Sequence, residues 1–220
     1  MRNKLVYILG ALVAVLFVRN LYVILNVLPD EANQGAMYRI MFFHIPSWWT
    51  AGLALTVAGV TSGLYLATGK MKYDAISVSV TEVAVAFLCI GMTTGMIWAR
   101  IIWGIWWTWD ARLTSALICV LLYGGYLILR NGIEDPTSRA RISAAFNIFA
   151  FVDVPIVWYS IRWWRTQHPQ PMTLPRDMWM AILANWLALI ILMTIFVLLR
   201  LRQENMRREV DGLRRLAHAI

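Results

Sequence analysis

The side chains best suited to chemistry in this sequence are its three histidines, His44, His168 and His218. Imidazole nitrogens are common ligands of metal ions. His218 lies in a polar segment near the C-terminus, where we expect a solvated side chain. The two cysteines, Cys89 and Cys119, lie inside apolar runs and form neither a C-x-x-C motif nor a metal-site spacing. They therefore indicate no disulfide framework.

Tryptophan is the second unusual feature, because its twelve residues are distributed unevenly along the chain. Eleven of them lie in or beside three hydrophilic segments, 29–46, 99–112 and 162–177, and Trp186 follows two turns into the last apolar run. Ordinary membrane-interface belts would place tryptophan about equally at both ends of the spans. We therefore expect a wide aromatic surface at one end, able to lie against a large, flat, apolar ligand.

The most specific stretch reads W-G-I-W-W-T-W-D-A-R-L-T-S at residues 103–115. If residues 103–110 were helical, three of its tryptophans and Asp110 would share one face. Asp110 would then cap the following helix or orient Arg112. The residues of this stretch that we expect to contact a ligand are Trp103, Trp106, Trp107, Trp109, Asp110 and Arg112.

Arginines and two of the histidines accompany this stretch. His44 and His168 flank it in the sequence, and two imidazoles on one side of a membrane can bind one iron from opposite faces. Either histidine alone would be better explained by an interfacial position, and only the two together with the aromatic stretch favour a ligand site. Arginine binds carboxylates in a bidentate way, so the set suits a flat macrocycle with acidic arms, such as haem. The six cations of the hydrophilic segments are all arginines: Arg39, Arg100, Arg112, Arg162, Arg165 and Arg176.

Membrane-spanning helices must position these residues, because the composition is not that of a soluble domain. Hydrophobic residues make up 60% of the 220 residues and charged residues only 15%, against about 25% charged in soluble proteins. Six apolar stretches are long enough to cross a bilayer core of about 30 Å. The sequence therefore predicts an all-α integral membrane protein of six transmembrane helices without a separate soluble domain. The predicted spans are about 5–28, 47–68, 76–98, 113–129, 142–161 and 178–199.

Positive charge sets the predicted orientation. Thirteen lysines and arginines fall on the side of the N-terminus and six on the other side, which places both termini in the cytoplasm and the tryptophan-rich loop 99–115 outside. Residues 1–200 form the predicted membrane domain, and 201–220 a basic amphipathic cytoplasmic tail with apolar residues at helical spacing. This tail would lie on the anionic inner leaflet or pack against a cytoplasmic partner such as an ATPase. It explains much of the net charge of +8, so nucleic-acid binding is not indicated.

Three ionisable residues, Arg19, Glu82 and Asp153, fall inside predicted spans, where charge is costly. Glu82 is near enough to a span end to reach the interface. We expect Asp153 to make a helix-to-helix contact, with Arg19 as one candidate partner. The first span carries Arg19 and lacks a small-residue cleavage site, so we interpret it as an uncleaved helix.

The sequence resembles the haem-handling WWD-domain membrane proteins, and more narrowly the haem exporter protein C (CcmC) family of bacterial cytochrome c maturation. The tryptophan-rich loop is the hallmark of that family, and its form W-G-x-W-W-x-W-D-A-R-L-T is present without a gap. The segment 38–46, with His44, is similar to the one that carries the family's first haem histidine. The segment 155–168, ending at His168, is similar to the one that carries the second. The resemblance covers nearly the whole chain.

The resemblance implies that His44 and His168 are axial ligands of the iron of haem b and that the tryptophan loop forms a platform for the haem edge. It implies a bacterial inner-membrane protein that holds haem at its periplasmic face and delivers it to a periplasmic haem chaperone. The other implied partners are the ATPase and membrane subunits of an ABC transporter and a small single-span accessory protein. This sequence contains no Walker motif, so ATP hydrolysis must belong to a partner.

We therefore expect a binding and transfer protein and not an enzyme. A haem lyase that joins haem to apocytochrome c is an alternative, although related lyases are longer. A transmembrane haem channel is another alternative. An electron-transfer cytochrome b subunit would need histidine pairs in the middle of its spans, and the six predicted spans contain none.

Overall fold

The computed structural model of the chain describes residues 2–169 and 173–218, and every regular element within these ranges is a helix. Two short helices, one of π type and one of 3-10 type, lie between the first two long ones. In chain order the elements are α1 (Arg2–Tyr22), η1 (Val23–Val27), η2 (Ala36–Ile40), α2 (Met41–Thr68), α3 (Met71–Ile102), α4 (Ala111–Asn131), α5 (Pro136–Phe151), α6 (Asp153–Trp163) and α7 (Arg176–His218).

Six helical segments are long and apolar enough to cross a membrane, which confirms the predicted fold class. A helix suits the bilayer because it satisfies its backbone hydrogen bonds internally. The fifth segment combines α5 and α6, which are separated only at Val152. Pro155 has no N–H to donate to the carbonyl of Phe151, so the helix is interrupted at that point.

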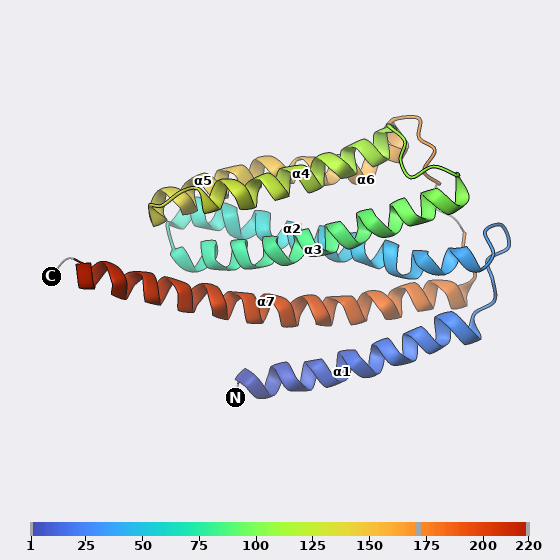
Figure 1. Ribbon diagram of the computed structural model, residues 1–220, viewed down its shortest axis with the longest axis horizontal. Coiled ribbons are helices and arrows are strands. Elements are labelled where there is room, and N and C mark those ends of the chain that lie inside the picture. The colour runs from blue at the N-terminus through green and yellow to red at the C-terminus, as the bar shows by residue number, and fades with distance from the viewer. Residues whose placement is uncertain (1, 170–172, 219–220) are drawn as a thin grey trace.

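The helices lie side by side in layers (Figure 1). α2 and α3 form the centre and make the most extensive contact with each other. α4, α5 and α6 lie on one side of this pair, and α7 lies on the other. α1 is outermost and packs mainly against α7.

The bundle has two chemically different ends. α1 begins and α7 ends at the first, which we call the terminal end (Figure 1). The segments 28–40, 103–110 and the described part of 164–175 lie at the opposite end, which we call the loop end. Three hydrophilic segments that are far apart in the sequence therefore meet at one end of the bundle.

Small side chains allow α2 and α3 to approach closely in the middle of the bundle. Ala51, Ala54 and Ala58 of α2 are fully buried and share one apolar cluster with Ala84 and Leu88 of α3. Helices in a bilayer associate largely through such close van der Waals packing. The central pair can therefore serve as a rigid support for both ends.

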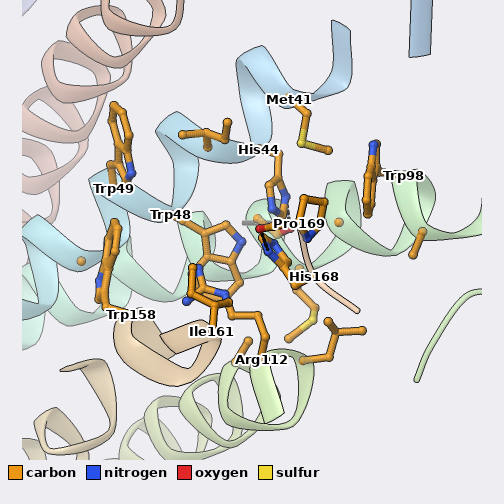
Figure 2. Close-up of a pocket in the computed structure, with 18 of the residues that line it drawn as sticks. Met41, His44, Trp48, Trp49, Trp98, Arg112, Trp158, Ile161, His168 and Pro169 are labelled. Atoms are coloured by element: carbon orange, nitrogen blue, oxygen red, sulfur yellow. Dashed lines mark hydrogen bonds between the residues drawn. The ribbon is translucent and has the colours of Figure 1, made fainter. Parts of the chain in front are cut away.

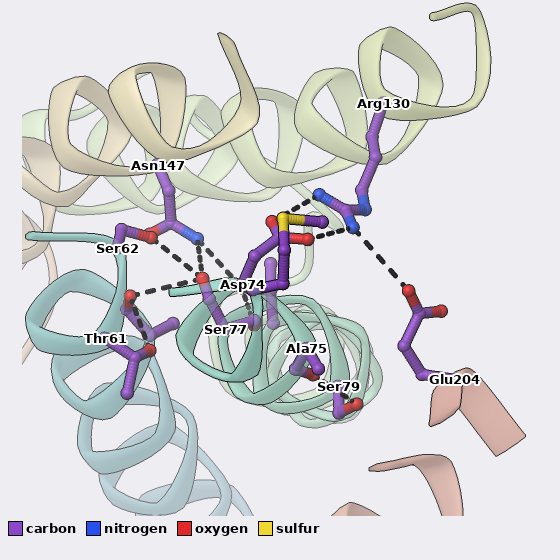
Figure 3. A network of polar contacts seen from close by, with 12 residues as sticks. Thr61, Ser62, Asp74, Ala75, Ser77, Ser79, Arg130, Asn147 and Glu204 are labelled. Carbon is purple, nitrogen blue, oxygen red and sulfur yellow. Dashed lines mark hydrogen bonds and ion pairs between the residues drawn. The ribbon is translucent and has the colours of Figure 1, made fainter. Parts of the chain in front are cut away.

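Charged side chains are paired at the terminal end (Figure 3). Arg130 of α4 donates two hydrogen bonds of 2.8 Å to the two carboxylate oxygens of Asp74 in α3. Arg208 of α7 donates to Asp74 at 2.6 Å and to Glu204 at 2.8 Å. The side chains of Arg130 and Asp74 are only 7% and 2% exposed, and bidentate, desolvated pairs are the strong kind. This network joins α3, α4 and α7.

Uncharged polar side chains continue toward the middle of the bundle. Asn147 of α5 donates a 2.9 Å hydrogen bond to Thr81 of α3. The hydroxyls of Ser62 in α2 and Ser77 in α3 lie 2.8 Å apart (Figure 3). These contacts hold the central pair to its neighbour α5.

The charged residues within the predicted spans have partners of their own. Glu82 of α3 accepts a 2.8 Å hydrogen bond from Arg200 of α7. Arg19 donates to the adjacent asparagine at 3.1 Å, and Asp153 lies beside the thiol of Cys119. Asp153 of α6 therefore makes the expected helix-to-helix contact, with α4, but Arg19 is not its partner, because α1 packs on α7 whereas α6 packs on α4.

The segment after residue 200 continues α7 without interruption to His218. Its first turns belong to the terminal-end network through Glu204 and Arg208. Two parts of the predicted tail 201–220 lie outside the described residues: the side chain of His218, and residues 219–220. The predicted apolar stripe includes the exposed side chains of Met206, Val210 and Leu213.

Candidate functional site: an aromatic cavity with two histidines

A cavity of about 1150 Å³ lies at the loop end of the bundle. Residues of α2, α3, α4, α6 and α7 line it together with the loops between them. The lining is mainly apolar and aromatic, with a few polar side chains, as is usual for sites that bind small molecules. Both candidate histidines, His44 and His168, are among the lining residues (Figure 2).

His44 lies in the first turns of α2 and faces α3. Its Nδ1 lies 3.0 Å from the carbonyl oxygen of Gly91 and 3.1 Å from Oγ1 of Thr94. Because a carbonyl oxygen only accepts, Nδ1 must carry the proton and donate it to Gly91. Nε2 then keeps its lone pair, which is the state of a histidine that binds a metal through that atom.

Two glycines of α3 make room for the side chains of α2. A Cβ at Gly95 would lie 2.8 Å from Cε1 of His44, and a Cβ at Gly91 would lie 2.7 Å from Nε1 of Trp48. Real Cβ atoms do not approach other atoms so closely, so a side chain at either position would displace its neighbour. The backbone of α3 therefore forms one wall of the pocket around the His44 ring.

His168 reaches the same cavity from the loop between α6 and α7. Its Nδ1 lies 3.0 Å from the carbonyl oxygen of Pro169, so the Nδ1 proton is again donated to a backbone carbonyl. Burial, together with the nearby Arg112 guanidinium, lowers the pKa of His168 to about 4. The ring is therefore neutral near pH 7, and its Nε2 is available as a ligand.

The two histidines lie in the same part of the cavity (Figure 2). Among the described residues, no group of three or more His, Cys, Asp or Glu side chains could hold a metal ion. Two imidazoles alone are too few for an isolated zinc or iron ion. They are the number required by a metal whose other four positions are filled by a macrocycle.

Arginine is present in the described lining at Arg112 of α4 and Arg162 of α6. Arg112 donates to the carbonyl of Val157, and the Arg162 guanidinium lies 5.8 Å from the centroid of the Tyr159 ring. Both lie at the cavity with donors suited to carboxylate groups. By contrast, Arg39 pairs with Asp30 at 2.9 Å and Arg100 donates to the carbonyl of Gly104, and neither lines the cavity.

Eight of the twelve tryptophans line the cavity. Trp49 stacks on Trp179 at a centroid distance of 6.4 Å and meets Trp186 edge to face at 5.3 Å. The indole N–H groups of Trp107 and Trp186 are buried without a hydrogen-bond partner among the described residues. These donors suit a ligand that brings its own acceptors. The eight residues are Trp48, Trp49, Trp98, Trp103, Trp107, Trp158, Trp179 and Trp186.

The loop 103–110 is not helical, so its tryptophans do not share one face. Gly104 has a φ of +76°, which lies in the left-handed region and turns the chain out of α3. Trp103 and Trp107 line the cavity as a result, whereas Trp106 and Trp109 are 54% and 76% exposed. The loop thus has an inner pair and an outer pair of tryptophans.

Asp110 does not line the cavity, but it connects the two loops around it. Its Oδ1 caps α4 by accepting the backbone N–H of Leu113 at 2.8 Å, as one of the two expected roles requires. Its Oδ2 accepts hydrogen bonds from Thr166 Oγ1 at 2.8 Å and from the N–H of Gln167 at 3.1 Å. Thr166 in turn accepts the N–H of His168 at 3.0 Å. The tryptophan loop therefore fixes the segment that carries the second histidine.

The structure places five of the eight candidate residues in the cavity lining: His44, His168, Trp103, Trp107 and Arg112. Trp106, Trp109 and Asp110 do not line it. Sequence reasoning did not select Arg162, Gly91 or Gly95. Only Arg162 had a signal, because it belongs to the arginine set of the hydrophilic segments.

Known proteins resemble this chain over most of its length. A family model described as Heme exporter protein C matches residues 1–216. The Heme exporter protein C of Bradyrhizobium diazoefficiens is 35% identical over 196 residues, which cover 84% of this chain and 73% of that protein. The Heme exporter protein C of Escherichia coli strain K12 is 34% identical over 142 residues, 64% of this chain and 57% of that protein. The match with the latter therefore spans little more than half of its length.

Proposed function

This chain belongs to the haem exporter protein C family, and from that premise we propose that it binds haem b in the loop-end cavity and passes it to a haem chaperone. The single observation that carries the proposal is the state of the two histidines. Each donates its Nδ1 proton to a backbone carbonyl and keeps the Nε2 lone pair free.

His44 and His168 are the proposed axial ligands. Haem bound between them would supply an iron with two axial positions for imidazole. The carbonyls of Gly91 and Pro169 orient the rings and make Nε2 more basic, in the manner of the outer-shell partners of metal-binding histidines. Neither ring must lose a proton before it binds iron. With the ring proton on Nδ1, Nε2 carries none.

Arg112 and Arg162 are the proposed partners of the acidic arms of haem. Both line the cavity, and a guanidinium group matches a carboxylate in shape as well as in charge. The aromatic lining would cover the apolar faces of the macrocycle and exclude water from the iron. We assign no bond-making step to this chain, so its proposed role is binding and presentation, not enzymatic catalysis.

The outer tryptophans form the proposed contact surface for the chaperone. Trp106, Trp109, Trp163 and Trp164 are all more than half exposed at the loop end. Exposed aromatic clusters of this kind mark protein interaction sites. With the orientation predicted from charge, the loop end faces the periplasm of a bacterial inner membrane and the terminal end faces the cytoplasm.

The remaining proposed partners are the ATPase and membrane subunits of an ABC-type haem exporter and a small single-span protein. The printed name of the relatives, Heme exporter protein C, supports a place in such an exporter. The cytoplasmic part of α7 beyond residue 200 is a candidate contact for the ATPase. Its basic, amphipathic surface extends past the paired charges of the terminal end.

The proposal is tested by titrating hemin into the detergent-purified protein and following the Soret band. We expect saturable binding by the wild-type protein and weaker binding by His44→Ala and His168→Ala. His218→Ala is the matched control, because it removes an imidazole at the other end of the chain. Equal binding by all three variants would contradict the ligand assignment, and no binding by the wild-type protein would contradict the function.

A further inference from the structure

The first turns of α2 contain a backbone group that the helix itself cannot satisfy. In an α-helix the N–H of residue 46 donates to the carbonyl of residue 42. Residue 46 is Pro46, which has no N–H, so the carbonyl of Phe42 loses its partner within the helix. Phe42 is only 1% exposed, which keeps water from taking the place of that partner.

Asn185 of α7 supplies the missing hydrogen bond. Its Nδ2 donates to the carbonyl oxygen of Phe42 at 2.6 Å, although the two residues are 143 positions apart in the sequence. Asn185 is fully buried. Its Oδ1 has no hydrogen-bond partner among the described residues, so this amide is costly to bury for packing alone. A leucine, which has the same number and branching of side-chain heavy atoms, would avoid that cost.

His44 lies in the turn of α2 that is bounded by Phe42 and Pro46. A proline within a helix allows the preceding turn to bend, because one hydrogen bond is absent and the ring crowds the preceding carbonyl. The direction of the His44 side chain follows from the position of that turn. The bond from Asn185 fixes the turn to α7, while the Gly91 carbonyl holds the imidazole from α3.

We propose that Asn185 is a positioning residue for haem binding, which acts by fixing the Pro46-interrupted turn that carries His44. The inference rests on the proposed function in one respect, namely that His44 is a haem ligand. Asn185 itself does not line the cavity, although the next residue, Trp186, does. We assign its effect on haem to the backbone of α2, because its printed hydrogen bond is to the Phe42 carbonyl.

The experiment compares Asn185→Leu in two backgrounds, with Pro46 and with Pro46→Ala. Alanine at position 46 restores the N–H that donates to the Phe42 carbonyl, so Asn185 becomes dispensable. We expect Asn185→Leu to raise the hemin dissociation constant roughly tenfold, as for a buried carbonyl left without its partner. In the double variant, we expect a constant within about twofold of that of Pro46→Ala alone.

A second measurement keeps the inference testable without haem. Hydrogen–deuterium exchange of residues 41–47, recorded without hemin, should be faster in Asn185→Leu than in the wild-type protein. The exchange should return toward the level of Pro46→Ala in the double variant. If the wild-type protein failed to bind hemin, the proposed function would be contradicted while these exchange rates still decided the role of Asn185.

Asn147→Leu is the matched control, because Asn147 is another fully buried asparagine that joins two helices. It lies among the polar contacts that hold α5 to α3, and we expect its hemin affinity to stay close to that of the wild-type protein. Equal losses in Asn147→Leu and Asn185→Leu would overturn the proposal in favour of general loosening of the bundle. So would an Asn185→Leu effect of the same size in both backgrounds, or no effect in either.

Discussion

At the terminal end of the bundle, charged side chains bind one another, whereas at the loop end the polar groups that face the cavity keep part of their bonding capacity free. Asp74 and Arg130 form a bidentate pair, and Arg208 adds a third group to it. In the cavity, His44 and His168 each have one nitrogen bonded to a backbone carbonyl and one available. The first arrangement joins helices, and the second prepares a site for a ligand.

The helix α4 has one arginine near each end, and so contains both a paired charged group and a group that faces the cavity. Arg130 donates to a buried carboxylate, and Arg112 donates to the Val157 carbonyl while it lines the cavity. Residue type alone therefore does not reveal whether an arginine is structural or binds a ligand. What distinguishes the two is whether a carboxylate of the protein lies within reach. An arginine that is paired with such a carboxylate has few hydrogen-bond donors left for a ligand.

The largest expected effect comes from breaking the terminal-end pair. Arg130→Met would leave Asp74 buried without its main partner, and removal of one member of a buried pair costs about 3–5 kcal/mol. We expect a large fall in the midpoint of thermal unfolding, measured in detergent. Hemin affinity of the fraction that remains folded should be nearly unchanged.

Arg112→Met is the matched variant on the same helix. It removes no ion pair with a carboxylate, so we expect a small change in stability and a fall in hemin affinity of about fivefold, about 1 kcal/mol. If Arg112→Met destabilised the protein as much as Arg130→Met, the distinction between the two ends would be wrong.

The next largest effect is expected at the wall of the histidine pocket. Gly95→Ala would place a Cβ 2.8 Å from Cε1 of His44, and overpacking of this kind costs about 1–3 kcal/mol. Because the His44 ring must move, we expect the hemin dissociation constant to rise by about tenfold or more, measured by Soret titration. Gly124→Ala in α4 is the control, since nothing lies within 4 Å of an added Cβ there. A wild-type affinity in Gly95→Ala would contradict the proposed position of His44.

A smaller effect is expected from the carboxylate that connects the two loops. Asp110→Asn keeps one acceptor oxygen, so either the cap of α4 or the bonds to Thr166 and Gln167 must be lost. We expect hemin affinity to fall severalfold, with faster hydrogen–deuterium exchange in residues 164–168.

Asp135→Asn is the matched control at the terminal end. Asp135 caps α5 by accepting the N–H of Ser138 at 2.7 Å, and this bond holds the pKa of its carboxyl below the usual value. Its replacement should leave hemin binding unchanged. An equal loss of hemin affinity in both variants would show that capping in general, and not the link to His168, is responsible.

The smallest effect on haem itself is expected from the outer tryptophans. Trp109 is 76% exposed and does not line the cavity, so Trp109→Ala should change hemin affinity by less than about twofold. Transfer of haem to a purified haem chaperone should nevertheless become slower. Trp107→Ala is the inner counterpart, and we expect it to weaken hemin binding directly. Normal transfer by Trp109→Ala would exclude this residue from the partner surface.

Much of the fold could be predicted from the sequence, because membrane-spanning helices depend on the length and hydropathy of local stretches. The six spans follow from composition alone. The lengths of the helices were less predictable: α2 begins at Met41, before the predicted span, and α7 continues to His218. Hydropathy reports where lipid surrounds a helix, whereas the backbone continues to be helical beyond that region.

The candidate site was predictable to the extent that residue type carries the chemistry. His44 and His168 could be selected as imidazoles, and the tryptophans as a cluster. The expectation of a helical loop was wrong, because Gly104 turns the chain where the periodicity alone allowed a helix. Asn185 carried no signal, since its partner is the backbone carbonyl of a residue far away in the sequence.

The central claim is that His44 and His168 bind the same iron, and the ferric spin state of the hemin-loaded protein tests it most directly. Electron paramagnetic resonance should show a low-spin signal in the wild-type protein, because two imidazoles provide a strong axial field. His44→Gly and His168→Gly should each show high-spin iron that returns to low spin when imidazole is added. A low-spin signal that persists in either variant without imidazole would contradict the account.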